Sequence, residues 1–319
     1  MPEVMDDRKS RFVGCLLGCA CGDVLGAAVE MQTRSEILQQ YPQLLRDFQS
    51  GLRGFGCYTD DTEMTLALAR LILRNGDVDA ADCACAYAEA FTPQRGYGRG
   101  AVTVLTALQH GVDWQETGIM LFAAGSFGNG APMRIAPVGL LYGHLDAAHL
   151  TAKVKAAVWM THTHQEAIEA AVLQARAIGV LLDTVSSPNP AEFIEQLMTY
   201  LPGSILNDRL RRLQELLRQQ AVADEVVAAF GCGVRSADSW PPVLWAALRF
   251  IDDPQEAIIQ AVNLGGDTDT IGAMTGALVG ALHGSSWLPQ RWVDNLENGA
   301  DGRDELIAMA GKLADFQFV

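Results

Sequence analysis

The sequence has 319 residues, of which 49% are hydrophobic and 19% charged, so it can bury a sizeable apolar core. Lys and Arg number 23 against 38 Asp and Glu, which gives a formal net charge of −15. A chain this acidic, with no basic block, is a poor candidate for binding bare nucleic acid through its phosphates, whereas its carboxylates suit hard cations.

The cysteines and the N-terminal region indicate a cytoplasmic protein. The seven cysteines form no C-x-x-C pair, so we expect small buried thiols rather than a soft-metal site. Residues 1–11 are polar and do not resemble a signal peptide, and the apolar run that begins at Phe12 is interrupted by Asp23. We therefore expect no membrane-spanning segment.

Helical periodicity recurs along the whole chain, whereas the alternation typical of strands is nearly absent. In chain order it predicts helices over 8–28, 60–74, 79–91, 99–110, 133–142, 146–160, 165–183, 191–200, 208–220, 241–252, 255–263, 269–284 and 303–315. The breaks fall at turn-forming segments such as "GSFGNGAP", "SSPNP" and "SWPP". No linker or repeat divides the chain, so we predict a single all-α domain over residues 1–319, and nothing in it demands a partner subunit.

Two of these helices carry glycine at every fourth position. The glycines are Gly14, Gly18, Gly22 and Gly26 in the first helix, and Gly272, Gly276, Gly280 and Gly284 in the second. An interior helical glycine costs about 1 kcal/mol relative to alanine, so two regular rows need a reason. Such a row lets another backbone approach closely, and we expect each helix to pack tightly against a neighbour at the centre of the fold.

Acidic residues gather in three short segments with apolar or glycine-rich surroundings. They are "CGDVLGAAVE" with Asp23 and Glu30, "CYTDDTEM" with Asp60, Asp61 and Glu63, and "GGDTDT" with Asp267 and Asp269. Capping of a helix N-terminus explains one carboxylate, but it explains neither the two doublets nor the threonines beside them. Carboxylates that converge without a cation repel one another, and a hard divalent cation removes that cost. The clusters therefore favour a metal site over simple capping.

Six segments occur in the order found in one enzyme family. "CGDVLGAAVE", "YTDDTEM", "RGYGRGAV", "GSFGNGAPMR", "THTH" and "GGDTDTIGAMTGA" resemble the ADP-ribosylglycohydrolase family, and they frame residues 12 to 284. That family includes the enzymes that reactivate ADP-ribosylated dinitrogenase reductase and the vertebrate ADP-ribosylhydrolases. The resemblance implies a compact all-α fold with two divalent cations, Mg²⁺ or Mn²⁺, in a central cleft.

The resemblance also assigns residues to roles. The positions that match metal ligands are Thr59, Asp60, Asp61, Asp267, Asp269 and Thr270. The positions implicated in catalysis are Glu30, Asp23 and Asp61, and the Glu30 position is alternatively implicated in gating the cleft. The positions that match ADP-ribose contacts are Gly96, Gly125, Ser126, Phe127, Gly128, Asn129, Gly130 and His162. Arg134 is assigned to surface or structural pairing instead of phosphate binding.

The implied activity is hydrolysis of the bond between C1″ of the distal ribose and a modified side chain, such as arginine or serine. Glu30 or an aspartate would act as general acid or base. An ADP-ribosylated protein is the expected partner, and an ADP-ribosylated nucleic acid end stays open as a substrate. The alternatives are an ADP-ribose binder without catalysis and a metal-dependent phosphate hydrolase.

Overall fold

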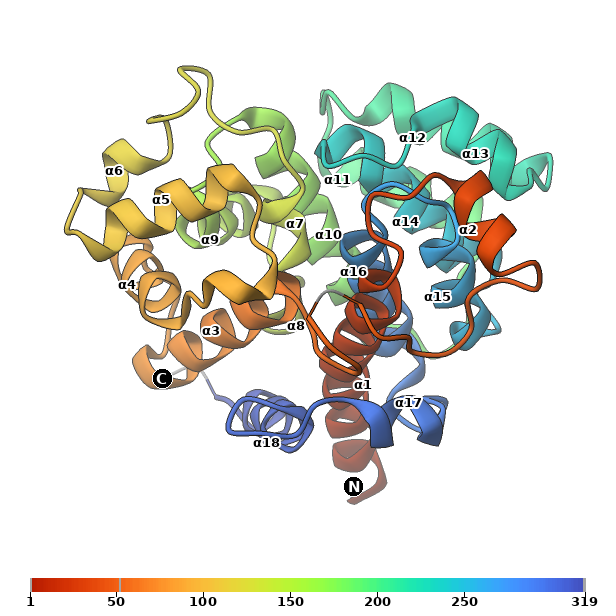
Figure 1. Cartoon of the computed structure of the whole chain (residues 1–319), viewed down its shortest axis with the longest axis horizontal. Helices are drawn as coiled ribbons and strands as arrows, with labels where there is room; N and C mark the ends of the chain where they lie inside the picture. Colours follow the sequence, from red (N-terminus) through yellow and green to blue (C-terminus); the bar gives the residue numbers. More distant parts are fainter. Residues whose placement is uncertain (1, 52, 318–319) are drawn as a thin grey trace.

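Two glycine-rich helices, α1 (Pro2–Ala27) and α16 (Thr268–His283), run through the centre of the fold (Figure 1). The computed structural model of the protein describes residues 2–51 and 53–317. The two helices lie antiparallel, with their glycine rows facing each other. A Cβ atom placed on Gly18 would lie 2.4 Å from the carbonyl oxygen of Gly276, and one on Gly276 would lie 1.9 Å from that of Gly18. The prediction of tight packing is confirmed, and each row has the other as its neighbour.

Gly276→Ala is expected to destabilise the protein strongly. The added methyl group would meet the backbone of α1, which has no side-chain torsion that can yield, so we expect a loss at or above the usual overpacking range of about 1–3 kcal/mol. Urea unfolding should show a lower midpoint for this variant. Gly233→Ala is the control, because a Cβ there meets no atom within 4 Å. Equal midpoints for the two variants would contradict the packing described here.

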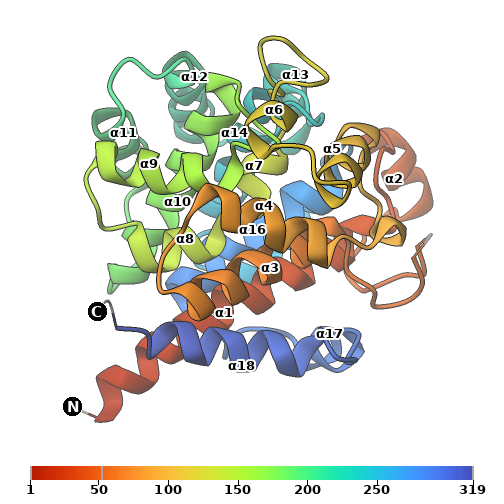
Figure 2. The same ribbon diagram turned by 90° about the vertical axis from the view of Figure 1, so that its left-hand side faces the viewer.

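The remaining helices surround this central pair. They are α2 (Arg34–Gln40), α3 (Asp60–Asn75), α4 (Ala80–Ala90), the 3-10 helix η1 (Pro93–Arg95), α5 (Arg99–Gln109), α6 (Trp114–Thr117), α7 (Gly130–Met133), α8 (Ala136–Tyr142), α9 (Ala147–Val158), α10 (Gln165–Asp183), α11 (Pro190–Tyr200), α12 (Asn207–Arg218), α13 (Ala223–Phe230), α14 (Ser236–Arg249), α15 (Pro254–Val262), α17 (Gln290–Asn295) and α18 (Arg303–Ala314). Helices α3 to α6 lie on one side of the pair and α11 to α15 on the other (Figure 1), and α18 crosses α1 near the N-terminus (Figure 2).

The all-α prediction is confirmed, since the described residues form helices and no strands. Several local predictions were wrong. Helices α2, α6, α13 and α17 were not predicted, and the predicted helix over 133–142 overlaps α7 only at Met133 before α8 begins at Ala136. The break at "SWPP" does not exist, because Pro241 and Pro242 lie inside α14. Each proline removes one helical hydrogen bond. The burial of that stretch, including Trp240 and Trp245, outweighs the loss.

Helix α1 bears on the expectation about membrane segments. Asp7–Ala27 is long and apolar enough, by length and composition, to cross a membrane, but 78% of its most apolar window is buried inside the protein. Because α1 packs against α16 and α18, it is a core helix of the fold. All seven cysteines are free, as expected, and five of them are buried.

Candidate active site

The N-terminus of α3 is held in place by an aspartate from α1. Asp23 is fully buried, and its carboxylate accepts hydrogen bonds from the backbone N–H of Thr59 at 3.0 Å and of Thr62 at 3.2 Å. The Thr62 hydroxyl donates a further bond at 2.5 Å. Asp23 and the Thr59 hydroxyl, which accepts the N–H of Asp61 at 3.3 Å, therefore hold the start of the helix. This leaves the carboxylates of Asp60 and Asp61 available to the space in front of it.

The N-terminus of α16 faces this turn. Thr270 donates a hydrogen bond from its hydroxyl to Asp61 at 3.3 Å, so the two helix ends are in direct contact. Asp267 stands at the cap position without capping the helix with its side chain, and accepts a bond from Asn129 at 2.5 Å instead. One carboxylate oxygen from each of Glu30, Asp267 and Asp269 lies within 4.8 Å of the others. The acidic segments at both helix ends and on the Glu30 loop therefore form one cluster.

The loop that carries Glu30 is fixed to the turn before α16 by backbone hydrogen bonds. Met31 donates its N–H to the carbonyl of Gly266, and Gly266 donates its N–H to the carbonyl of Gln32, both at 2.7 Å. Gly266 adopts φ 78°, and a Cβ there would lie 2.0 Å from the carbonyl oxygen of Cys232. Only glycine fits this turn. The close approach of Glu30 to Asp267 and Asp269 thus depends on the "GG" that precedes them.

The cluster is electrostatically unfavourable without a cation. Desolvation, and then the charge of Asp23, raise the pKa of Asp60 to about 8. Burial and then the neighbouring aspartates raise the pKa values of Asp61 and Asp269 well above the usual range. Among the described residues, Arg53 is the one basic residue paired with any of Glu30, Asp60, Asp61, Asp267 and Asp269, and its partner is Glu30 at 3.0 Å. The Oδ1 atom of Asp61 is buried and has no hydrogen-bond partner within the described chain.

These residues fit a hard divalent cation. Carboxylate and hydroxyl oxygens are the ligands that Mg²⁺ and Mn²⁺ prefer, and Asp61 Oδ1 is a buried acceptor that lacks a donor. Within the cluster formed by Glu30, Asp267 and Asp269, neither cysteine nor histidine contributes a ligand, which argues against zinc.

Raised pKa values predict how pH acts on the metal-free protein. Asp60 has an ordinary pKa of 3.8 and a folded pKa of about 8, so its contribution to stability is complete below pH 3.8 and is lost as the pH rises through 8. A cation binds the ionised carboxylates, so it should stabilise the protein more at pH 8 than at pH 5. We expect the gain in melting temperature on adding Mn²⁺ to chelated protein to grow with pH. A gain that is constant or largest at pH 5 would exclude this assignment.

Above the acids lies a cavity of about 470 Å³, and most of the predicted site residues line it. Those lining it are Glu30, Asp60, Asp61, Gly96, Ser126, Phe127, Gly128, Asn129, Gly130, His162, Asp267, Asp269 and Thr270. Three predicted residues lie outside the lining. Asp23 and Thr59 are buried behind Asp61, and Gly125 packs against Thr163.

Part of the cavity lining is apolar, and most of this part was not predicted from the sequence. The apolar residues in the lining include Ala101, Val104, Leu121, Phe122 and Val234. The side chains of Phe122 and Phe127 are 55% and 47% exposed, respectively, which is unusual for phenylalanine. The four consecutive apolar residues at 119–122 were a possible signal, but they fall in a stretch without helical periodicity.

The glycine-rich loop 125–130 is held against the segment 234–236. Asn129 donates its N–H to the carbonyl of Val234 at 2.9 Å, and the Ser236 N–H bonds the carbonyl of Phe127 at 3.0 Å. The Ser236 hydroxyl bonds the carbonyl of Gly128 at 2.9 Å. These bonds fix the loop in the wall of the cavity.

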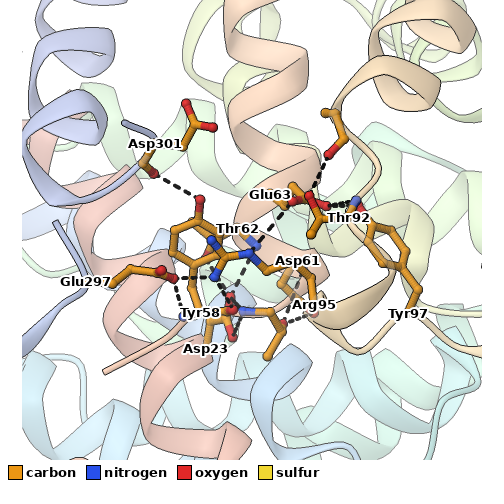
Figure 3. A network of polar contacts seen from close by, with 12 residues as sticks. Asp23, Tyr58, Asp61, Thr62, Glu63, Thr92, Arg95, Tyr97, Glu297 and Asp301 are labelled. Atoms are coloured by element: carbon orange, nitrogen blue, oxygen red, sulfur yellow. Dashed lines mark hydrogen bonds and ion pairs between the residues drawn. The ribbon is translucent and has the colours of Figure 1, made fainter. Parts of the chain in front are cut away.

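A second polar network holds Tyr58, which precedes the turn formed by Thr59, Asp60 and Asp61 (Figure 3). Glu297 accepts the N–H of Tyr58 at 2.9 Å, and Arg95 donates to the carbonyl of the same residue at 3.0 Å. Arg95 and Glu297 are themselves hydrogen-bonded, and the guanidinium lies 3.8 Å from the Tyr58 ring centroid. Both peptide groups of Tyr58, immediately before Thr59, are thereby fixed by one ion pair.

Glu297→Ala is expected to weaken cation binding. Without Glu297 the Tyr58 N–H loses its acceptor and Arg95 its ion pair, so the turn that presents Asp60 and Asp61 loosens. Loss of such an outer partner typically costs about 10–100-fold in metal affinity, which Mn²⁺ calorimetry can measure. Tyr58→Phe is the control, because it removes only the phenol bond to the Asp301 carbonyl at 3.0 Å. Unchanged affinity in Glu297→Ala would rule out this role.

Comparison with known proteins identifies the family. The sequence profile of the ADP-ribosylglycohydrolase family matches residues 5–317. The chain belongs to the ADP-ribosylglycohydrolase family. It is 32% identical to ADP-ribosylhydrolase ARH3 of Mus musculus, over 95% of this chain and 91% of the relative. The identity to ADP-ribosylhydrolase ARH3 of Homo sapiens is also 32%, over 95% and 93% of the two chains.

A solved structure of the family agrees with the fold. It is described as an ADP-ribosylglycohydrolase-related protein complex, is 29% identical in sequence, and superposes with a TM-score of 0.73 over 98% of this chain and 99% of its own. Family membership and these relatives support a glycohydrolase that removes ADP-ribose. The acidic cluster and the cavity above it are the features of this chain that such an activity would use.

Proposed function

We propose that the protein hydrolyses the glycosidic bond at C1″ of the distal ribose in ADP-ribosylated substrates and releases free ADP-ribose. One observation carries the proposal. The lining of a single cavity includes an acidic cluster, a glycine-rich loop and exposed phenylalanines. These surfaces suit a ribose, a pyrophosphate and an adenine ring, in that order.

Two divalent cations, Mg²⁺ or Mn²⁺, complete the proposed site. Thr59, Asp60 and Asp61 would hold them from the α3 side, and Asp267, Asp269 and Thr270 from the α16 side. When bound, such cations orient sugar hydroxyls and offset the charge of the aspartates.

Glu30 is the residue we propose as general base. Its carboxylate lies with the acidic cluster and lines the cavity, and its side chain remains 28% exposed. It would accept a proton from water as the water oxygen attacks C1″, while the bond to the modified side chain breaks and that side chain takes up a proton. Asp23 is less suited, because four hydrogen bonds from Thr59 and Thr62 already occupy its oxygens. We assign Asp23 to holding the metal-binding turn.

A product assay tests the proposal. The protein is incubated with Mg²⁺ or Mn²⁺ and with arginine-, serine- and DNA-linked ADP-ribose, and the products are separated by chromatography. We expect free ADP-ribose from at least one substrate. AMP and ribose phosphate would indicate a phosphate hydrolase instead, and tight ADP-ribose binding without release from any substrate would indicate a binding protein.

A further inference from the structure

Arg134 is a buried cation without a carboxylate partner. Its side chain follows α7 and is 1% exposed, and within the described residues no Asp or Glu oxygen lies in ion-pair range of it. It donates to the sulfur of Met64 at 3.1 Å and to the hydroxyl of Thr161, and it lies 4.8 Å from the Tyr87 ring centroid. Of the two alternatives assigned from the sequence, burial excludes the surface, whereas the bonds to Met64 and Thr161 agree with structural pairing. Burying an unpaired charge is costly, which calls for a role.

The bond from Arg134 decides what the Thr161 hydroxyl does. A guanidinium has no acceptor atom, so the Thr161 oxygen must accept from Arg134. The single hydroxyl proton then has two acceptors within reach. One is the carbonyl of Val158 at 3.1 Å, and the other is Nδ1 of His162 at 2.8 Å.

The carbonyl of Val158 is already occupied. It accepts the N–H of Thr161 at 3.0 Å and the N–H of His162 at 2.8 Å, which uses both of its lone pairs. The Thr161 proton is thus directed to His162 Nδ1, the shorter contact. The charge of Arg134 on that side favours the same arrangement, because a lone pair facing a cation is more stable than an N–H.

The opposite edge of the His162 ring faces the glycine-rich loop. A Cβ atom on Gly130 would lie 3.0 Å from Nε2, and one on Gly128 would lie 3.3 Å from it, so the ring sits where side chains are absent. His162 lines the cavity, and within the described chain Nε2 has no hydrogen-bond partner. Burial and the charge of Arg134 lower the pKa of His162 well below its usual value, so the ring is neutral and carries one proton.

We propose that Arg134 and Thr161 are positioning residues that fix His162 as the Nε2–H tautomer, which donates a hydrogen bond to a phosphate oxygen of the ligand. The chain of donors runs from Arg134 to Thr161 to His162 and ends in the cavity. Its last step rests on the proposed function, because the phosphate is that of ADP-ribose. In this proposal Arg134, which also lines the cavity, acts through the hydroxyl and the ring.

The tautomer can be measured in the free protein, whatever its substrate. With ¹⁵N-labelled histidine, long-range ¹H–¹⁵N spectra distinguish a protonated Nε2 from a protonated Nδ1, and His162→Gln assigns its signal among the six histidines. We expect the Nε2–H tautomer of His162 in the wild type and in Thr161→Ser, and a mixture of the Nε2–H and Nδ1–H tautomers in Thr161→Val. Thr163→Val is the control, since its hydroxyl bonds the Gly118 carbonyl at 3.1 Å. A wild-type Nδ1–H overturns the proposal, even if Thr161→Val fails to fold.

Ligand binding tests the second part of the proposal, the hydrogen bond from His162 Nε2 to a phosphate oxygen. In calorimetry with ADP-ribose, Thr161→Val should bind about tenfold more weakly than the wild type, and Thr161→Ser should recover most of the affinity. Adenosine, which has no phosphate, should bind all three proteins alike. Equal ADP-ribose affinity in wild type and Thr161→Val overturns the relay. If the wild type does not bind ADP-ribose at all, the proposed function fails, while the tautomer measurement still decides the first step.

Discussion

Asp269→Ala is expected to abolish both divalent-cation binding and the release of ADP-ribose. Asp269 is 3% exposed and lies with Glu30 and Asp267 in the acidic cluster. Without its carboxylate, the α16 side retains only Asp267, which is engaged by Asn129, and the hydroxyl of Thr270. Mn²⁺ calorimetry and product chromatography on the same sample measure the two effects.

Metal-free Asp269→Ala should not be less stable than the metal-free wild type. The variant removes one of several carboxylates whose pKa values are raised by burial and by one another, so it relieves repulsion in the absence of a cation. Asp183→Ala is the matched control, because Asp183 is an exposed acid at the end of α10. Retained Mn²⁺ binding and turnover in Asp269→Ala would refute the metal assignment.

Glu30→Gln is expected to lose turnover while keeping ADP-ribose affinity. An amide oxygen can still accept the hydrogen bond from Arg53, so the loop geometry is preserved, but the amide cannot take a proton from water. General acid–base catalysis contributes about 10²- to 10⁴-fold, so kcat should fall within that range. Single-turnover rates and ADP-ribose calorimetry separate the two quantities.

Glu195→Gln is the control for that variant, because Glu195 is an exposed glutamate on α11, outside the cavity lining. Full turnover in Glu30→Gln would remove Glu30 from the chemistry. An ADP-ribose affinity that falls by the same factor as the turnover would instead assign Glu30 to substrate binding.

The acidic turns were predictable from the sequence because their signals are local. Asp60 and Asp61 precede a periodic apolar run, as do Asp267 and Asp269, and such positions begin helices. The glycine rows predicted close packing in the same way. Their pairing with each other was not predicted, because nothing in either row specifies its partner far along the chain. Gly26 and Thr268, which meet where the two helices pack, are 242 residues apart.

The parts of the site that the sequence did not reveal depend on long-range contacts. Glu297 meets Arg95 across 202 residues, and neither lies in a recognisable pattern. The pairing of Arg53 with Glu30 and the burial of Arg134 likewise follow from tertiary packing. A charged residue in a sequence is most often on the surface, and that expectation failed for Arg134.

Whether cations bind between the two helix ends can be measured by diffraction from a crystal grown with Mn²⁺ and ADP-ribose, recorded for its anomalous signal. We expect anomalous peaks between the N-termini of α3 and α16, within coordination distance of Asp61 and Asp269, with the distal ribose against them. Manganese bound elsewhere, or ADP-ribose seated in the cavity with no metal beside those aspartates, would contradict this expectation.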